Sequence, residues 1–353
     1  MATESRPTHI YVGAARSRPE TRGGLFRRAA GDDRWEPLTR GLPAETAVQA
    51  ITVHPANPDA IYLGTRSGPY RSADRGERWQ RLAFPEGVEV WSLLVHPTNQ
   101  RILYAGTSPV GVWRSDDGGD TWRRLPKAVE TERVKMKSFV CRVMRLAADP
   151  AHPDELYAAL EVGGAMRSLD AGETWEDCSA DLLKLAELPH LKSRIDSDTD
   201  VEGMLDGHAL CVSAARPGQV ILAVRMGLFL SPDRGASWRN MEVGRFSPLT
   251  YARDVRVSPH DPRVLYACLS PAARSQDGSL YRSEDLGETW TRFDRGVKAE
   301  TTMMAVALHQ RDPAQVYGVS RSGQVFGTGD GGRTWDERRL PAGVQDVYAI
   351  ACA

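Results

Sequence analysis

One short phrase recurs along this chain, and it constrains the fold more than any other feature. The phrase reads Ser/Thr-x-Asp-x-Gly-x-x-Trp, and its six full copies end at Trp79, Trp122, Trp175, Trp238, Trp290 and Trp335. A degenerate seventh copy, which lacks the Ser and the Gly, ends at Trp35. These seven tryptophans are spaced by 50 residues on average. A repeat of this length indicates a unit of several strands that packs against its neighbours.

Each copy of the phrase has the composition of a tight turn, and the copy at Ser168, Asp170, Gly172 and Trp175 shows it in full. A hydroxyl and a carboxylate at this spacing can accept hydrogen bonds from nearby backbone N–H groups. The glycine can supply a residue with positive φ. Because a turn explains every position, we interpret these acids as structural rather than catalytic or calcium-binding.

A second repeated segment precedes the turns and predicts a β-hairpin. Residues 51–65 and 93–107 share an apolar strand, a Pro- or Asn-containing turn and a second apolar strand. Alternation with period two between turn residues is typical of paired strands. Each unit is therefore expected to contain strand A, strand B, strand C, the Asp-containing turn and strand D.

The two ends of the chain complement each other. Residues 9–13 predict a B strand with no A strand before it, and residues 347–352 predict a lone A strand. We expect the last strand to complete the first blade, because closing a ring removes exposed sheet edges. The predicted fold is all-β: a single seven-bladed β-propeller of four-stranded blades over residues 1–353.

Composition excludes several classes of protein. The formal net charge is −1, which argues against a protein that binds nucleic acid mainly through phosphate contacts. No segment approaches about 18 consecutive apolar residues, so no membrane span is expected. The N-terminus lacks the apolar segment of a signal peptide, and the five scattered cysteines indicate a reducing compartment and no zinc site. Together these features predict a cytoplasmic location.

Comparison of the seven predicted A strands, position by position, singles out a few polar residues. His208 stands where most copies have an apolar residue at the first position. Arg145 and Asp254 replace small residues at the third position, in blades four and six. Trp91 and Arg253 occupy the variable second position.

Two long insertions fall beside the same blades, at residues 127–142 and 177–207. Both join a D strand to the next A strand, so both are expected on one face of the propeller, where loops commonly carry function. The second contains a predicted short helix at 180–191 with a mostly apolar face. A smaller insertion at 272–278, between strands B and C of blade six, should lie on the same face.

These signals predict a polar pocket at the channel mouth over blades four to six. Arginines there would bind an anionic or carboxylate-bearing group. A histidine would act as acid, base or ligand. The predicted catalytic residues are His208 and Asp254, and the predicted ligand-binding residues are Arg145, Arg253, Trp91 and Tyr251.

A structural interpretation of the same residues stays open. Arg145 and Asp254 could form a buried pair between blades, and His208 could be a hydrogen-bonded inner-strand residue. Structural networks of charged groups can resemble functional sites.

The series Asp196, Asp198, Asp200 resembles the opening of a calcium-binding EF-hand loop. Val201 stands at the sixth position, where such loops need Gly, and Gly207 at the twelfth, where they need Glu. A solvated loop with turn-forming aspartates is the preferred interpretation, with calcium or another divalent metal as the alternative. Otherwise no cofactor is expected.

The Ser-x-Asp-x-Gly-x-x-Trp phrase resembles the Asp box of BNR-repeat β-propellers, and the resemblance covers nearly the whole chain. This group includes sialidases and other glycoside hydrolases, sortilin-type receptors and photosystem assembly factors. The resemblance implies a propeller whose Asp boxes join the last two strands of each blade. Sialidases usually have six blades and an Arg-Ile-Pro motif, whereas here Arg194-Ile195 is followed by Asp196. A true sialidase is therefore not expected.

Two hypotheses for function follow. The first is a protein that binds a small polar or anionic ligand, such as a carbohydrate or carboxylate, and that could be a glycoside-hydrolase-like hydrolase or a lyase. Glycoside hydrolysis would need two carboxyls about 5 to 10 Å apart, and the candidates are Glu89, Glu202, Asp206 and Asp254. The alternative is a non-catalytic scaffold that docks a protein partner through residues 177–207.

Overall fold

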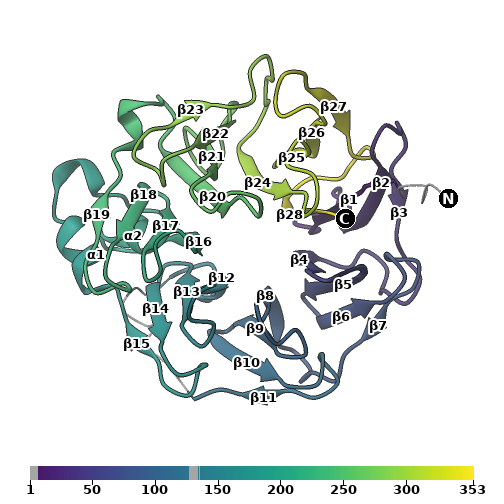
Figure 1. Cartoon of the computed structure of the whole chain (residues 1–353), viewed down its shortest axis with the longest axis horizontal. Helices are drawn as coiled ribbons and strands as arrows, with labels where there is room; N and C mark the ends of the chain where they lie inside the picture. The colour runs from purple at the N-terminus through teal and green to yellow at the C-terminus, as the bar shows by residue number, and fades with distance from the viewer. Residues whose placement is uncertain (1–6, 127–133, 135) are drawn as a thin grey trace.

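The computed structural model describes residues 7–126, 134 and 136–353. In these ranges, strands β1 to β28 form seven four-stranded antiparallel sheets. Figure 1 shows the sheets as blades arranged in a ring around a common axis. The seven-bladed β-propeller predicted from the repeat is therefore confirmed.

Each blade runs from an inner A strand to an outer D strand. The A strands of blades one to seven are β28 (Val347–Cys352), β4 (Val48–His54), β8 (Glu89–Val95), β12 (Val143–Ala148), β16 (Gly207–Val212), β20 (Tyr251–Val257) and β24 (Met303–Leu308). The B strands are β1 (His9–Ala14), β5 (Asn57–Thr65), β9 (Leu103–Ser108), β13 (Leu156–Leu160), β17 (Val220–Val224), β21 (Leu265–Ser270) and β25 (Val316–Ser320).

The outer half of each blade contains a C strand and a short D strand. The C strands are β2 (Gly24–Ala29), β6 (Gly68–Ser72), β10 (Gly111–Ser115), β14 (Gly164–Ser168), β18 (Gly227–Ser231), β22 (Ser279–Ser283) and β26 (Gln324–Thr328). The D strands are β3 (Glu36–Pro37), β7 (Gln80–Arg81), β11 (Arg123–Arg124), β15 (Glu176–Asp177), β19 (Arg239–Asn240), β23 (Thr291–Arg292) and β27 (Asp336–Arg339).

The chain ends close the ring. Strand β28 pairs antiparallel with β1, with Ile10 opposite Cys352 and Val12 opposite Ile350. Beyond these pairs, the backbone N–H of His9 donates to the carbonyl of Ala353 at 2.7 Å. The first blade thus takes three strands from the beginning of the chain and one from its end, as the sequence predicts.

The repeated phrase forms the same turn in each full copy. In blade four, the Ser168 hydroxyl accepts a hydrogen bond from the Gly172 N–H at 2.8 Å. The Asp170 carboxylate accepts one from the Thr174 N–H, also at 2.8 Å. The hydroxyl-to-glycine bond recurs in the copies that end at Trp79, Trp122, Trp238, Trp290 and Trp335. These bonds satisfy backbone groups that the turn leaves without a sheet partner.

Close packing between blades explains the valine that recurs at the first position of strand A. A Cβ built on Gly13 would lie 2.5 Å from a methyl group of Val48, and one on Gly106 would lie 2.5 Å from a methyl group of Val143. The glycine of one B strand thus makes room for the valine of the next blade. His208 departs from this packing and brings a polar ring to the same level.

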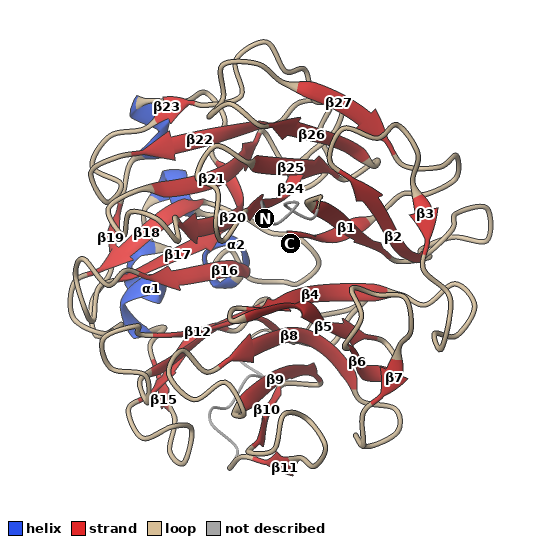
Figure 2. Ribbon diagram, turned by 45° about the vertical axis from the view of Figure 1, so that its right-hand side comes forward, coloured by secondary structure: helices blue, strands red, loops and turns tan. Residues whose placement is uncertain are grey.

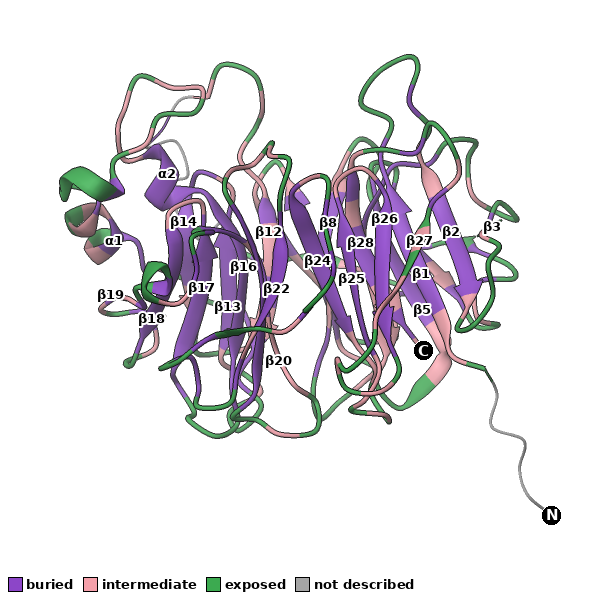
Figure 3. Cartoon of the chain, turned by 90° about the horizontal axis from the view of Figure 1, so that it is seen from above, coloured by how far each residue is buried: buried purple, intermediate pink, exposed green. Residues whose placement is uncertain are grey.

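The insertion at 177–207 forms two short helices and a 3-10 turn rather than one helix over 180–191. Helix α1 (Ala180–Leu185) ends before a 3-10 turn at Pro189–Leu191, and α2 (Glu202–Leu205) follows. Leu188 has ψ of 130°, outside the helical region, because a residue that precedes proline is driven to extended backbone. Figure 2 shows the helices on one side of an otherwise all-strand molecule, and Figure 3 shows α2 at the edge of one face.

Three other expectations from the sequence concern the insertion at 127–142, the cysteines and membrane-spanning helices. Half of the insertion at 127–142 lies outside the described residues, namely positions 127–133 and 135. All five cysteines are free thiols. Among the described helices, none has the length and apolar character needed to cross a bilayer.

Candidate functional site

A cavity of about 50 Å³ lies on the axis of the propeller, between the inner strands. Its wall contains apolar residues of the inner strands. It also contains charged and aromatic side chains, which come from β8, β12, β16, β20 and β28. They are Trp91, Arg145, His208, Arg253, Arg256 and Tyr348. Four of the six residues predicted for the site therefore line one cavity, and the other two, Tyr251 and Asp254, contact the lining.

Asp254 holds two of the arginines in place. Its carboxylate lies 3.1 Å from the Nη2 atom of Arg145 and 3.1 Å from the Nε atom of Arg256. It also accepts hydrogen bonds from the backbone N–H groups of Val255 and Val306. With its side chain 1% exposed and both oxygens engaged, Asp254 is a structural anchor between blades four, six and seven.

Burial, and then the charge of a neighbouring arginine, lower the pKa of Arg145. The neighbouring arginine is Arg256, and Asp254 opposes the change, which brings the pKa to about 10. Two arginines around one aspartate give this cluster a net charge of +1, whereas a simple ion pair is neutral. A second anion would relieve the repulsion between the guanidinium groups.

His208 is held at both ring nitrogens. Its Nδ1 atom lies 2.7 Å from the carbonyl of Ala252, so Nδ1 carries a proton and donates. Its Nε2 atom lies 3.2 Å from the Asp206 carboxylate and 3.3 Å from the Tyr251 hydroxyl. Burial would raise the pKa of Asp206, but the charge of His208 and its hydrogen bond bring it below the ordinary value.

Arg253 projects into the cavity without a partner. Among the described residues, no hydrogen bond or ion pair engages its guanidinium group, although the group contributes to the cavity wall. Burial works against its charge, but Tyr251, Glu161, Asp206 and Tyr348 raise its pKa above the ordinary value. Arg253 therefore carries a full positive charge that is free to bind an anion.

Trp91 forms a wall rather than an open stacking surface. It is 6% exposed, and its Nε1 atom donates to Glu89 at 3.0 Å. The guanidinium carbon of Arg142 lies 4.0 Å from the ring centroid, and the Tyr348 ring meets it edge-on at 5.5 Å. These contacts occupy the ring, so its part in the site is to shape the cavity.

Sequence reasoning missed four residues beside the cavity: Arg142, Glu161, Arg256 and Tyr348. Arg256 lies two positions after Asp254, and period-two alternation along the strand could have found it. Arg142 and Glu161 form an ion pair from two different loops of blade four, and no repeat position marks either of them.

Two of the three aspartates proposed for calcium are engaged separately, whereas the Oδ2 atom of Asp196 is buried without a hydrogen-bond partner in the described part of the chain. Asp198 lies 3.1 Å from Lys137, and Asp200 pairs with Arg194. The loop folds instead around the buried Glu202, whose carboxylate accepts hydrogen bonds from the N–H groups of residues 195–197. This carboxylate supports the loop backbone.

Within the described ranges, one group of three potential metal ligands has its atoms within 4.8 Å of one another: Asp149, His152 and Glu155. Asp149 already accepts the Gly218 N–H at 2.6 Å. Glu155 already binds the Arg234 side chain, at 2.9 Å. Both carboxylates therefore have protein partners at this turn.

The fold and the cavity define a seven-bladed propeller with a basic cavity on its axis. No family model matches the chain. In sequence it is similar to a xyloglucanase from Paenibacillus sp., with 33% identity over 126 residues that cover 29% of this chain and 12% of the relative. The chain thus spans only a small part of the length of that relative.

Solved structures share the fold over most of the chain. A GH74 xyloglucanase from Xanthomonas campestris superposes with a TM-score of 0.64 at 19% identity, over 88% of this chain and 47% of that one. A structure of YCF48 bound to D1 peptide superposes with a TM-score of 0.52 at 14% identity, over 84% of this chain and 82% of that one. At these identities the likeness concerns the fold alone.

Proposed function

We propose that this propeller binds the anionic end of a polar ligand, a carboxylate in the first instance, in the cavity on the propeller axis, which residues from all seven inner strands line. The observation that carries the proposal is the Arg253 guanidinium, which is charged and unpartnered within the described chain and lines a cavity with two further arginines. A planar guanidinium group matches a carboxylate in geometry and charge.

The size of the cavity limits what can enter it. A volume of about 50 Å³ holds a few water molecules or one carboxylate group. The rest of the ligand would therefore lie on the face outside the channel, where the insertions are. A sugar acid or a chain with a carboxylate end fits this description.

The predicted site residues take distinct roles in this proposal. Arg253 binds the anion, and Arg145, held by Asp254, adds positive charge behind it. His208, held by Ala252 and Asp206, shapes the cavity wall beside the arginines. Asp254 acts as a positioning residue.

A hydrolase activity is a separate candidate, because its substrate would not need an anionic group. The carboxyl groups of Glu161 and Asp206 have pKa values displaced in opposite directions: burial raises that of Glu161, whereas His208 helps to lower that of Asp206. Such divergence is typical of an acid and a base in one site. The similarity to xyloglucanases makes xyloglucan oligosaccharides the first substrates to test. The assay compares how fast the wild type and Glu161→Gln release new reducing ends from these oligosaccharides.

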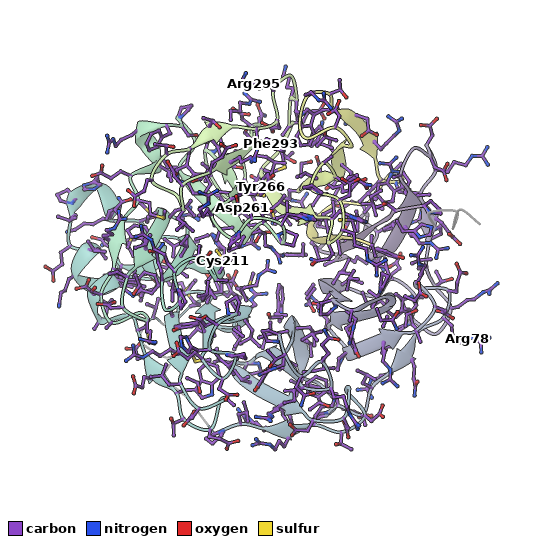
Figure 4. The ribbon with its side chains drawn as sticks, viewed as in Figure 1. Arg78, Cys211, Asp261, Tyr266, Phe293 and Arg295 are labelled. Atoms are coloured by element: carbon purple, nitrogen blue, oxygen red, sulfur yellow. The ribbon has the colours of Figure 1, made fainter. Side chains whose placement is uncertain are left out.

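The binding proposal is tested by calorimetry with glucuronate, and with glucose as the uncharged partner. We expect saturable binding of glucuronate that Arg253→Gln weakens by about tenfold or more, because a charge-assisted hydrogen bond is lost. Arg295→Gln is the matched control, since Figure 4 shows Arg295 at the outer edge of the ring. Equal binding of glucose, or equal loss in both variants, would contradict the proposal.

A protein-docking function is the second candidate. The superposed YCF48 chain, which is bound to a peptide, is covered over 82% of its length, whereas the xyloglucanase is covered over 47%. In the insertion at 177–207, Leu188 and Ile195 are the exposed large apolar residues. Leu188→Glu should abolish the binding of a partner that docks there and should leave ligand binding at Arg253 unchanged.

A further inference from the structure

A second pocket, which we call the rim pocket, opens on the same face as the channel mouth. It has a volume of about 430 Å³. Its walls come from loops of blades one, six and seven that join strands B and C or strands D and A, and such loops all lie at the channel-mouth face. The lining residues are Ser17, Arg18, Arg274, Ser275, Gln276, Thr301, Arg321, Ser322, Gln345 and Asp346.

Every residue of this lining is polar or charged. Four carry hydroxyl groups and two carry amides, and three arginines face a single aspartate, so the lining has a net charge of +2. Such a composition is unsuited to an apolar ligand. It matches a ligand that combines hydroxyl groups with negative charge.

Arg321 is fixed at the back of the rim pocket. Its Nε atom lies 3.1 Å from the Asp346 carboxylate, and its Nη1 atom donates to the carbonyl of Ala273 at 2.9 Å. The same Asp346 carboxylate accepts a hydrogen bond from the Ser17 hydroxyl. One aspartate thus joins blade one to blade seven and holds the arginine in a single orientation.

Arg18 and Arg274 differ from Arg321, because both are exposed and their guanidinium groups have no hydrogen-bond or ion-pair partner in the described part of the chain. They approach the pocket from blades one and six. Two unpaired cations and one fixed cation therefore surround the same space. Repulsion between them would fall on binding an anion of charge near −2.

We propose that the rim pocket binds a phosphomonoester of a sugar or another polyol, with the phosphate held by Arg18, Arg274 and Arg321. A phosphomonoester carries about −1.5 to −2 charge at neutral pH, close to the charge of the lining. The hydroxyl and amide groups would bind the polyol. The lining has no aromatic ring on which a base could stack, which favours a sugar phosphate over a nucleotide.

This site does not depend on the proposal for Arg253. The two sites share a face, and the charge of Arg321 is one of those that act on Tyr251 beside His208. They are lined, however, by different residues. Substitutions in one leave the other intact, so either proposal can fail alone.

The test measures binding of glucose 6-phosphate by calorimetry at physiological ionic strength. Its variant is Arg18→Gln/Arg274→Gln, and its matched control is Arg78→Gln/Arg295→Gln. The control removes the same charge from the outer edge of the ring, where Figure 4 places both residues. Inorganic phosphate, glucose and AMP are the comparison ligands.

We expect saturable binding of glucose 6-phosphate that falls by about tenfold or more in the rim variant and is retained in the outer-edge control. Weaker binding of inorganic phosphate would support the role of the hydroxyl and amide groups. Absence of saturable binding, or equal loss in both double variants, would overturn the site. Equal or tighter binding of inorganic phosphate or AMP would overturn the assignment to sugar phosphates.

Discussion

The Oδ1 atom of Asp254 on β20 lies 3.1 Å from the Nη2 atom of Arg145 on β12, although the intervening blade contributes its own inner strand between them. The narrow axis of the ring makes this contact possible. The Nε atom of Arg256 also lies 3.1 Å from the Oδ1 atom of Asp254. Three charged residues thereby join non-adjacent blades.

Replacing Asp254 tests how much this cluster stabilises the ring. We expect Asp254→Ala to lower the free energy of unfolding by about 3 kcal/mol, because it leaves two arginines side by side without an anion. Asp261→Ala, which removes an exposed ion pair with Arg263, should cost much less, because solvent screens the pair. Urea unfolding measures both. Similar values for the two variants would show that the cluster is not a structural anchor.

The Asp boxes should make the fold sensitive to acid. Hydrogen bonds from Thr174 lower the pKa of Asp170, and the pKa values of the other box aspartates are lowered as well. A lowered folded-state pKa gives stability that is present above the unfolded pKa and lost as pH falls through the folded value. Urea midpoints should therefore fall between about pH 5 and pH 2. Asp170→Asn should show a shallower fall; an unchanged slope would contradict this account.

Closure by the last strand should be necessary for cooperative folding. Deleting β28 would expose the edge of β1 and remove its pairing along the strand. We expect the deleted chain to lose its cooperative thermal transition and to aggregate, as measured by circular dichroism and size-exclusion chromatography. A circular permutant that joins the two ends and opens the exposed turn near Gly87 should fold normally. A stable monomer without β28 would refute the closure argument.

Two leucines of one insertion should respond differently to truncation. Leu182 on α1 is 0% exposed within a large apolar cluster, whereas Leu188 is 43% exposed. Leu182→Ala should lower the free energy of unfolding by about 3 kcal/mol through the cavity it leaves. Leu188→Ala should change it by less than about 0.5 kcal/mol. Chemical unfolding of both variants checks the difference, and equal effects would contradict the packing of α1.

The Asp206–His208 contact should also affect the stability of the protein at acidic pH. His208 is the strongest of the charges that lower the pKa of Asp206 against the effect of burial. In His208→Gln the pKa of Asp206 should rise, so the part of the stability that this carboxylate contributes is lost at a higher pH than in the wild type. The measurement is the melting temperature as a function of pH. Tyr251→Phe, which keeps the imidazole of His208, is the control. Its melting temperature should fall with decreasing pH in the same way as that of the wild type.

Much of the fold could be predicted from the sequence because its determinants are local and repeated. The Ser168–Gly172 turn depends on residues a few positions apart, and six copies carry the same chemistry. The lone strands at the two ends pointed to closure by the same logic. The helix at 180–191 was predicted too long because Pro189 overrides the apolar pattern that precedes it.

The candidate site was reached only in part. Position-by-position comparison of the repeats pointed to Arg145, His208 and Asp254, because each breaks a pattern that the sequence itself defines. It could not show that Asp254 binds two arginines while Arg253 binds none within the described chain, nor that the rim pocket joins loops of blades one, six and seven. Turn chemistry is encoded by neighbouring residues and is legible in the sequence. Arg145 and Asp254 come from strands more than a hundred residues apart, and only closure of the ring brings them together.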